Sequence, residues 1–158
     1  MRAALVVALS LAAAGPGGAP GTGRWDFEAD APALRDVRVE VRCKPVRGTV
    51  DRACGVVFRF QDAEHYYVAR ANALEDNVNL YRVVNGRREQ LKGWSGKVGT
   101  NAWHALAVEA RGDRLTIFWE GEPVIEARDG TFPAAGRVGV WTKADSVTYF
   151  DALAASPL

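Results

Sequence analysis

Residues 66–91, YYVARANALEDNVNLYRVVNGRREQL, decide the fold class, because they read as three consecutive antiparallel strands. Residues 67–72 and 78–84 are rich in β-branched and aromatic side chains, and residues 74–77 between them have turn chemistry. Asn85-Gly86 is the dipeptide that best adopts the positive φ angles of a two-residue hairpin. The stretch therefore predicts a β-meander within an all-β protein.

The rest of the chain repeats the same kind of pattern. Apolar and polar residues alternate over residues 37–43 and 54–60, and shorter strand-like runs follow at 102–111, 114–119, 123–128, 137–143 and 147–154. Glycine-bearing turns separate several of these runs, and no helical period is present. About nine or ten short strands of this kind predict an antiparallel two-sheet β-sandwich of the jelly-roll type.

The first residues have a different composition. A positive start at Arg2, an apolar run and the small residues Ala12-Ala13-Ala14 predict a signal peptide over residues 1–14, and hence a secreted or periplasmic protein. The apolar run is too short to cross the roughly 30 Å of a bilayer core as a helix, so no membrane span is expected. Residues 15–24 predict a flexible Gly/Pro linker, and residues 25–158 form the predicted domain.

The net charge restricts the kinds of binding partner, and the two cysteines bear on the cellular compartment. The formal net charge is +1 and no basic run of five or more occurs, which argues against nucleic acid and anionic membranes. Cys43 and Cys54 occupy apolar positions in the alternating patterns of two successive predicted strands. If those strands pair as a hairpin, the two sulfurs either form a disulfide in an oxidising compartment or pack as buried thiols.

Several motifs resemble the concanavalin A-like, laminin-G-like jelly rolls. They are Trp103-His104-x-Leu106-x-Val108, Gly121-x-Pro123, Gly136-x-Val138-Gly139 and Tyr149-Phe150-Asp151. GVVFRFQDAEHYYVARAN and VGVWTKADSVTYFD further resemble the bacterial secreted 3-keto-disaccharide hydrolase domains, a family associated with 3-keto-glycoside lyase and hydratase activity. The resemblance extends over roughly residues 36–153.

Because alternate residues of a strand point to opposite faces of its sheet, a set of polar and aromatic side chains is predicted to share one solvent-facing surface. If these strands share a sheet, the face presents aromatic rings beside amides and guanidinium groups, the combination that sugars bind. The predicted ligand-binding residues are Arg59, Arg70, Asn72, Tyr81, Trp141, Lys143 and Tyr149. The alternative is an ordinary solvated face with weak cross-strand pairs.

The sequence offers fewer candidates for catalytic or metal-binding residues than for ligand-binding residues. The run of carboxylates that jelly-roll glucanases carry on one strand is absent, which disfavours ordinary glycoside hydrolysis. The 3-keto-glycoside resemblance implies one base, for which Asp151, Asp145 and His104 are candidates, and an oxyanion stabiliser such as Arg70 or Lys143. His104 also suits a packing role at the core edge. Residues 75–77 carry oxygen donors for calcium but too few of them, so neither a metal nor a cofactor is predicted.

The sequence thus predicts a secreted β-sandwich that binds a carbohydrate or glycoside on its concave sheet. One alternative is an enzyme that acts on 3-keto-glycosides, and a second is a structural interaction domain of the cell envelope.

Overall fold

The computed structural model describes residues 5–7, 23–26 and 32–158, and in these residues it contains twelve strands and no helix. The strands are β1 (Leu5–Val7), β2 (Gly23–Asp26), β3 (Val37–Arg47), β4 (Ala53–Asp62), β5 (His65–Asn72), β6 (Asn77–Val84), β7 (Arg87–Ser95), β8 (His104–Arg111), β9 (Arg114–Trp119), β10 (Glu122–Arg128), β11 (Arg137–Lys143) and β12 (Val147–Pro157).

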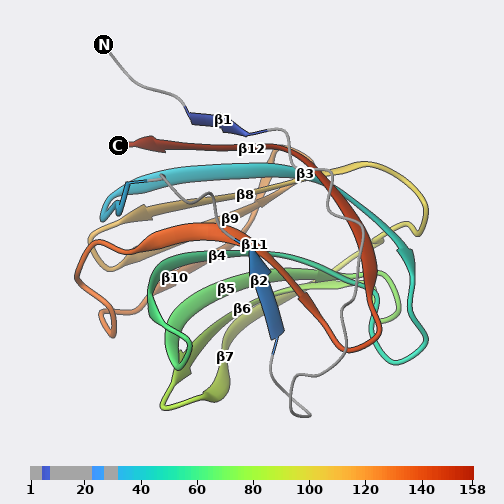
Figure 1. Cartoon of the computed structure of the whole chain (residues 1–158), viewed down its shortest axis with the longest axis horizontal. Coiled ribbons are helices and arrows are strands. Elements are labelled where there is room, and N and C mark those ends of the chain that lie inside the picture. Colours follow the sequence, from blue (N-terminus) through green and yellow to red (C-terminus); the bar gives the residue numbers. More distant parts are fainter. Residues whose placement is uncertain (1–4, 8–22, 27–31) are drawn as a thin grey trace.

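The strands form two antiparallel sheets that pack face to face (Figure 1). Sheet A has the order β1-β12-β3-β8-β9-β10, and sheet B has the order β2-β11-β4-β5-β6-β7. The all-β, two-sheet prediction is confirmed. The strand count exceeds the predicted nine or ten, partly because short strands at the front of the chain extend the edges of both sheets.

The predicted meander is present as β5, β6 and β7, which are neighbours in sheet B. The turn before β6 places Asp76 at φ 49°, and the next turn places Asn85 and Gly86 at φ 51° and 72°. These are the left-handed conformations that the turn residues were expected to adopt. The turn chemistry therefore fixes the register of three strands along one half of sheet B.

The core lies between the sheets and follows strand parity. Val37, Val39 and Val41 of sheet A face Val56 and Phe58 of sheet B, and these side chains are buried. Apolar residues on both inner faces exclude water from a single interior, which is the main source of stability in a sandwich of this kind.

The hairpin expected from β3 and β4 does not form. β3 lies in sheet A beside β12 and β8, whereas β4 lies in sheet B beside β11 and β5. Cys43 and Cys54 are joined by a disulfide, with their Cα atoms 6.3 Å apart, so the bond crosses the core and links the two sheets. Parity correctly placed both sulfurs in the interior but did not reveal that the chain changes sheets after β3.

The predicted signal peptide lies outside the described residues except for Leu5–Val7, and the predicted linker lies outside them except for its last two residues. Leu5–Val7 pairs with Leu153–Ala155 of β12 at the edge of sheet A. Gly23–Asp26 pairs with Val140–Lys143 of β11 at the edge of sheet B, so the ordered sandwich includes two residues of the predicted linker. Among the described residues no helix has the length and apolar character needed to cross a membrane.

Candidate functional site

The outer face of sheet B carries a row of aligned residues that runs across the whole sheet. In register from edge to edge, the row is Trp25, Trp141, Gly55, Arg70, Asn79 and Gly93. Tyr81 lies in the next row of the same face, opposite Val68. We call this surface the Trp141 face. It unites the predicted binding residues Arg70, Tyr81 and Trp141 on one side of one sheet.

Two glycines let the indole of Trp141 lie along the sheet. A Cβ atom on Gly23 would lie 1.7 Å from Nε1 of Trp141, and one on Gly55 would lie 2.9 Å from its Cε3. Any side chain at either position would therefore collide with the ring. The missing side chains give the indole room between two backbones, as expected where a glycine interrupts a strand.

Around Trp141 the face is apolar although it points away from the core. Tyr66, Val68, Tyr81 and Val83 are buried in a second hydrophobic cluster with Trp141. Trp25 packs at its edge, with ring centroids 5.5 Å from Tyr66. The buried members of this cluster are at most 9% exposed, so this part of the outer face forms a second, smaller apolar cluster instead of an ordinary solvated sheet surface.

Arg70 is the polar centre of the face and is only 2% exposed. Its Nη2 donates to Glu75 Oε2 at 2.9 Å and to Asn77 Oδ1 at 3.0 Å. The Asn79 amide is best satisfied when Oδ1 accepts from Tyr81 Oη at 2.9 Å and from Arg70 Nη2 at 3.2 Å. A hydrogen bond from Asn77, aided by the Arg70 charge, lowers the pKa of Glu75. The guanidinium is therefore held in one orientation.

Two guanidinium N–H donors on the Trp141 face, Arg70 Nε and Arg88 Nη1, are buried and have no acceptor. Burial raises the pKa of Tyr66, and a hydrogen bond from the Trp141 indole to the Tyr66 hydroxyl partly offsets this effect. Arg88 lies over the rings, with its guanidinium carbon 4.4 Å from the Tyr81 ring centroid and 6.0 Å from that of Trp141. A buried donor without a partner costs about 1–3 kcal/mol, so each of these arginines bears an unsatisfied hydrogen-bonding cost in the free protein.

Asn72 and Lys143 lie on the same face but serve the fold. Asn72 Nδ2 donates to Asp51 Oδ1, and Asn72 Oδ1 accepts from the Leu74 amide at 2.9 Å. Lys143 Nζ lies 3.4 Å from Asp51 Oδ2. Because the buried carboxylate of Asp51 engages both side chains, they fix the loop that leads into β4. The structure thus gives these two predicted ligand residues a positioning role.

Arg59 is not part of the face, which corrects the parity argument. Its φ of 45° interrupts the alternation of β4, so Phe60 joins the outer cluster. The Arg59 side chain is fully buried, where Nε donates to the Arg35 carbonyl at 2.9 Å and Nη1 to the Phe132 carbonyl at 3.1 Å. Arg59 therefore ties two loops to β4.

Sheet A holds three other predicted site residues, Tyr149, Asp151 and His104. They are therefore not part of the Trp141 face, which belongs to sheet B. Tyr149 is 39% exposed on β12. His104 aligns with Cys43, whereas Asp151 aligns with Arg42, the next residue along β3, so the two candidate bases lie on opposite faces of sheet A. His104 packs on Trp119 at 4.8 Å and is held by Glu120 and the Gly99 carbonyl, in agreement with its expected packing role.

Asp145 also has a structural position. Its carboxylate accepts hydrogen bonds from the amides of Thr49, Val50 and Asp51, at 2.7–3.2 Å. These bonds, led by the one from Thr49, lower the pKa of Asp145 far below its usual value. A carboxylate of such low basicity is poorly suited to remove a proton, and the hydrogen bonds give Asp145 the structural role of closing a loop.

The turn at residues 75–77 uses its oxygens internally. Glu75 accepts from Arg70 and Asn77, and Asp76 accepts from the Val98 amide at 2.9 Å. Within the part of the chain that the structure describes, no group of three or more His, Cys, Asp or Glu residues is arranged to hold a metal ion.

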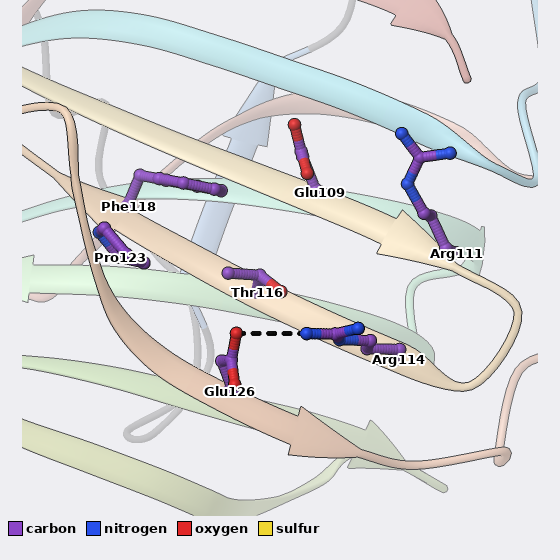
Figure 2. Close-up of a pocket in the computed structure, with 7 residues that line it drawn as sticks. All are labelled: Glu109, Arg111, Arg114, Thr116, Phe118, Pro123 and Glu126. Carbon is purple, nitrogen blue, oxygen red and sulfur yellow. Dashed lines mark hydrogen bonds and ion pairs between the residues drawn. The ribbon is translucent and has the colours of Figure 1, made fainter.

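The outer face of sheet A carries a separate groove (Figure 2). Its polar side chains pair with one another. Arg114 Nη2 lies 3.2 Å from Glu126 Oε1, the contact drawn in Figure 2, and Arg38 Nη1 lies 3.0 Å from Glu109 Oε1. The groove is lined by Glu109, Arg111, Arg114, Thr116, Phe118, Pro123 and Glu126. Because its charges are largely satisfied, this groove is a weaker candidate than the Trp141 face.

The fold is a concanavalin A-like β-sandwich, and comparison with known proteins supports this class. No protein-family model matches the chain. A levanase of Bacillus subtilis (strain 168) is 31% identical over 83 residues, which cover 51% of this chain but 12% of the levanase. The chain therefore spans about an eighth of the length of that relative.

Solved structures give the same result for the fold. The carbohydrate binding module CBM66 from Bacillus subtilis matches with a TM-score of 0.75 and 22% identity, over 86% of this chain and 92% of that one. The galectin LEC-6 of Caenorhabditis elegans matches with a TM-score of 0.57 and 10% identity, over 87% and 99%. The resemblance to 3-keto-disaccharide hydrolases is not specifically supported by these matches and stays a prediction.

Residue-level prediction missed two important members of the site. Asn79 and Arg88 were not among the predicted ligand-binding residues. The alternation of β6 and the Asn85-Gly86 turn could have identified Arg88, because a two-residue turn sets Arg88 opposite Val83.

Proposed function

We propose that this chain is a carbohydrate-binding module that holds a sugar on the Trp141 face and does not turn it over. The observation that carries the proposal is a pair of arginines, Arg70 and Arg88, each with an N–H donor that lacks an acceptor, beside a cluster of aromatic rings on the outer face of sheet B. Sugar hydroxyls supply acceptors, and the C–H faces of a sugar ring pack on aromatic planes. The similarity to a levanase segment and to a carbohydrate binding module supports the same proposal.

We also propose that the protein acts outside the cytoplasm. The disulfide across the core suits an oxidising compartment, and the composition of residues 1–14 suits export. The enzymatic alternative gains no support from the geometry, because the candidate bases Asp151 and His104 lie in sheet A, away from Arg70, and the third, Asp145, is engaged by backbone amides of residues 49–51.

Binding can be tested by titration calorimetry with a panel of soluble glycans that begins with levan. We expect binding to at least one glycan without loss of substrate, and at least a tenfold loss of affinity in Arg70→Gln and Trp141→Phe. Trp141→Phe keeps an aromatic ring but removes the indole N–H and part of the ring, so it tests the contribution of the indole.

Matched controls are Arg114→Gln and Trp103→Ala, which change the same residue types on sheet A and at the start of β8. Both controls should bind as the unmodified protein does, and thermal unfolding should show that all four variants are folded. Binding that is insensitive to Arg70→Gln and Trp141→Phe would move the site elsewhere. Consumption of a 3-keto-glucoside by the unmodified protein would favour the enzyme instead.

A further inference from the structure

The charges on the Trp141 face do not balance. Arg70 is paired with Glu75 at 2.9 Å, and Lys143 is paired with Asp51 at 3.4 Å. Arg88 makes no ion pair with any of the residues that the structure describes. Three cations thus share two carboxylates, and the unmatched positive charge is on Arg88.

The unmatched cation lies against the aromatic cluster. Arg88 is half-buried and lies over the Tyr81 ring at 4.4 Å and near the Trp141 ring at 6.0 Å. The ring faces hold the guanidinium by cation–π attraction and remove part of its water. Its Nη1 atom is buried without an acceptor. A partly desolvated cation with a free donor stabilises an anion more than it would in open water.

The geometry of the Arg88 guanidinium indicates which class of anion it would bind. A guanidinium presents parallel N–H bonds that match the two oxygens of a carboxylate, and such charge-assisted pairs are roughly twice as strong as neutral hydrogen bonds. A neutral sugar would satisfy the Nη1 donor but would leave the charge uncompensated. Arg70 cannot take this role in the same way, because Glu75 already neutralises it.

We propose that the Trp141 face selects carboxylated sugars, of the uronic acid class, and that Arg88 is the residue that reads the carboxylate. This inference rests on the proposed function, since it specifies the ligand of the same face. The sugar lies over the Trp141 face, and its carboxylate pairs with the half-buried Arg88 guanidinium.

The test compares pairs of probes that differ only in charge. Oligogalacturonate and oligoglucuronate are titrated into the full chain beside the same oligosaccharides after reduction of their carboxyl groups, with levan as a neutral reference. We expect the carboxylated form of at least one pair to bind at least tenfold more tightly than its reduced form. Arg88→Gln should abolish that difference, and Arg88→Lys should restore part of it.

Arg87→Gln is the matched control, because Arg87 is the exposed neighbour on the same strand and its removal changes the net charge equally. It should leave the tenfold preference intact. Equal loss in Arg87→Gln and Arg88→Gln would show non-specific attraction of polyanions and overturn the proposal.

Equal affinity for carboxylated and reduced probes, or for levan, with no effect of Arg88→Gln would also overturn it, while leaving the proposed function in place. If none of the glycans binds, the proposed function fails, and the selectivity proposal fails with it.

Discussion

The disulfide between Cys43 and Cys54 should contribute about 3 kcal/mol to the free energy of unfolding. The two residues are 11 positions apart in the sequence. A closed loop of about that length removes about 9 cal/mol/K of chain entropy from the unfolded state, or about 3 kcal/mol at 25 °C. For a domain of this size, about 3 kcal/mol corresponds to a fall in Tm of about 10 °C.

Calorimetric melts of the double variant Cys43→Ala/Cys54→Ala and of the reduced unmodified protein provide the measurement. Both should melt about 10 °C below the oxidised protein, and reductant should not affect the double variant. The two samples test the same bond by independent routes, one of which removes two sulfur atoms from the core and one of which does not. A fall of less than about 2 °C in both would refute the argument that the bond constrains the unfolded chain.

Three further predictions concern the site and its supports. Gly55→Ala should destabilise the fold by about 1–3 kcal/mol and displace Trp141, so that glycan affinity and thermal unfolding change together; unchanged affinity would show that the indole position does not matter. Arg59→Met should lower the free energy of unfolding in urea by about 1–3 kcal/mol, because it leaves the buried Phe132 carbonyl and the partly buried Arg35 carbonyl without these donors, and a loss below about 0.5 kcal/mol would contradict this. Burial raises the pKa of Asp129, but hydrogen bonds from Thr131 and Tyr67 outweigh it and the net pKa is lowered; the contribution of Asp129 is therefore present above about pH 4 and is lost as the pH falls through its lowered folded value. Asp129→Asn should lower the free energy of unfolding by about 1–2 kcal/mol at pH 7 and should make that free energy depend less on pH below about pH 4. An unchanged pH dependence in this acidic range would exclude the role of Asp129.

The meander was predictable because its information is local. Asn85-Gly86 dictates a tight turn, and the alternation around Leu80 places Asn79 and Tyr81 on the opposite side of β6 from the core. Local patterns of this kind determine which side chains point inward and where the chain reverses.

Sheet membership was not predictable from the same patterns. Parity says that Cys43 and Cys54 point inward, but a strand that pairs with its neighbour and a strand that crosses to the other sheet have the same alternation. For the same reason Tyr149 was assigned to a face that it does not share. Pairing depends on contacts between residues that are far apart in the sequence, and a single sequence does not reveal them.

Arg59 shows a different limit. A single residue at φ 45° reverses the parity of everything that follows it in β4, and the residue itself is an ordinary arginine within an apolar run. Its conformation is stabilised by carbonyl groups of Arg35 and Phe132, which come from distant loops. Tertiary contacts therefore override the local pattern at this position.

Gly23 and Gly55 shape the Trp141 face without offering a side chain to any ligand. A survey that truncates ligand-contacting residues to alanine would pass over both positions, although an added methyl group at either would push the indole aside. Libraries built to retarget this surface should therefore keep these two glycines constant and vary the residues around them. Ligand selectivity could then be changed while the space that Gly23 and Gly55 leave for the Trp141 indole is preserved.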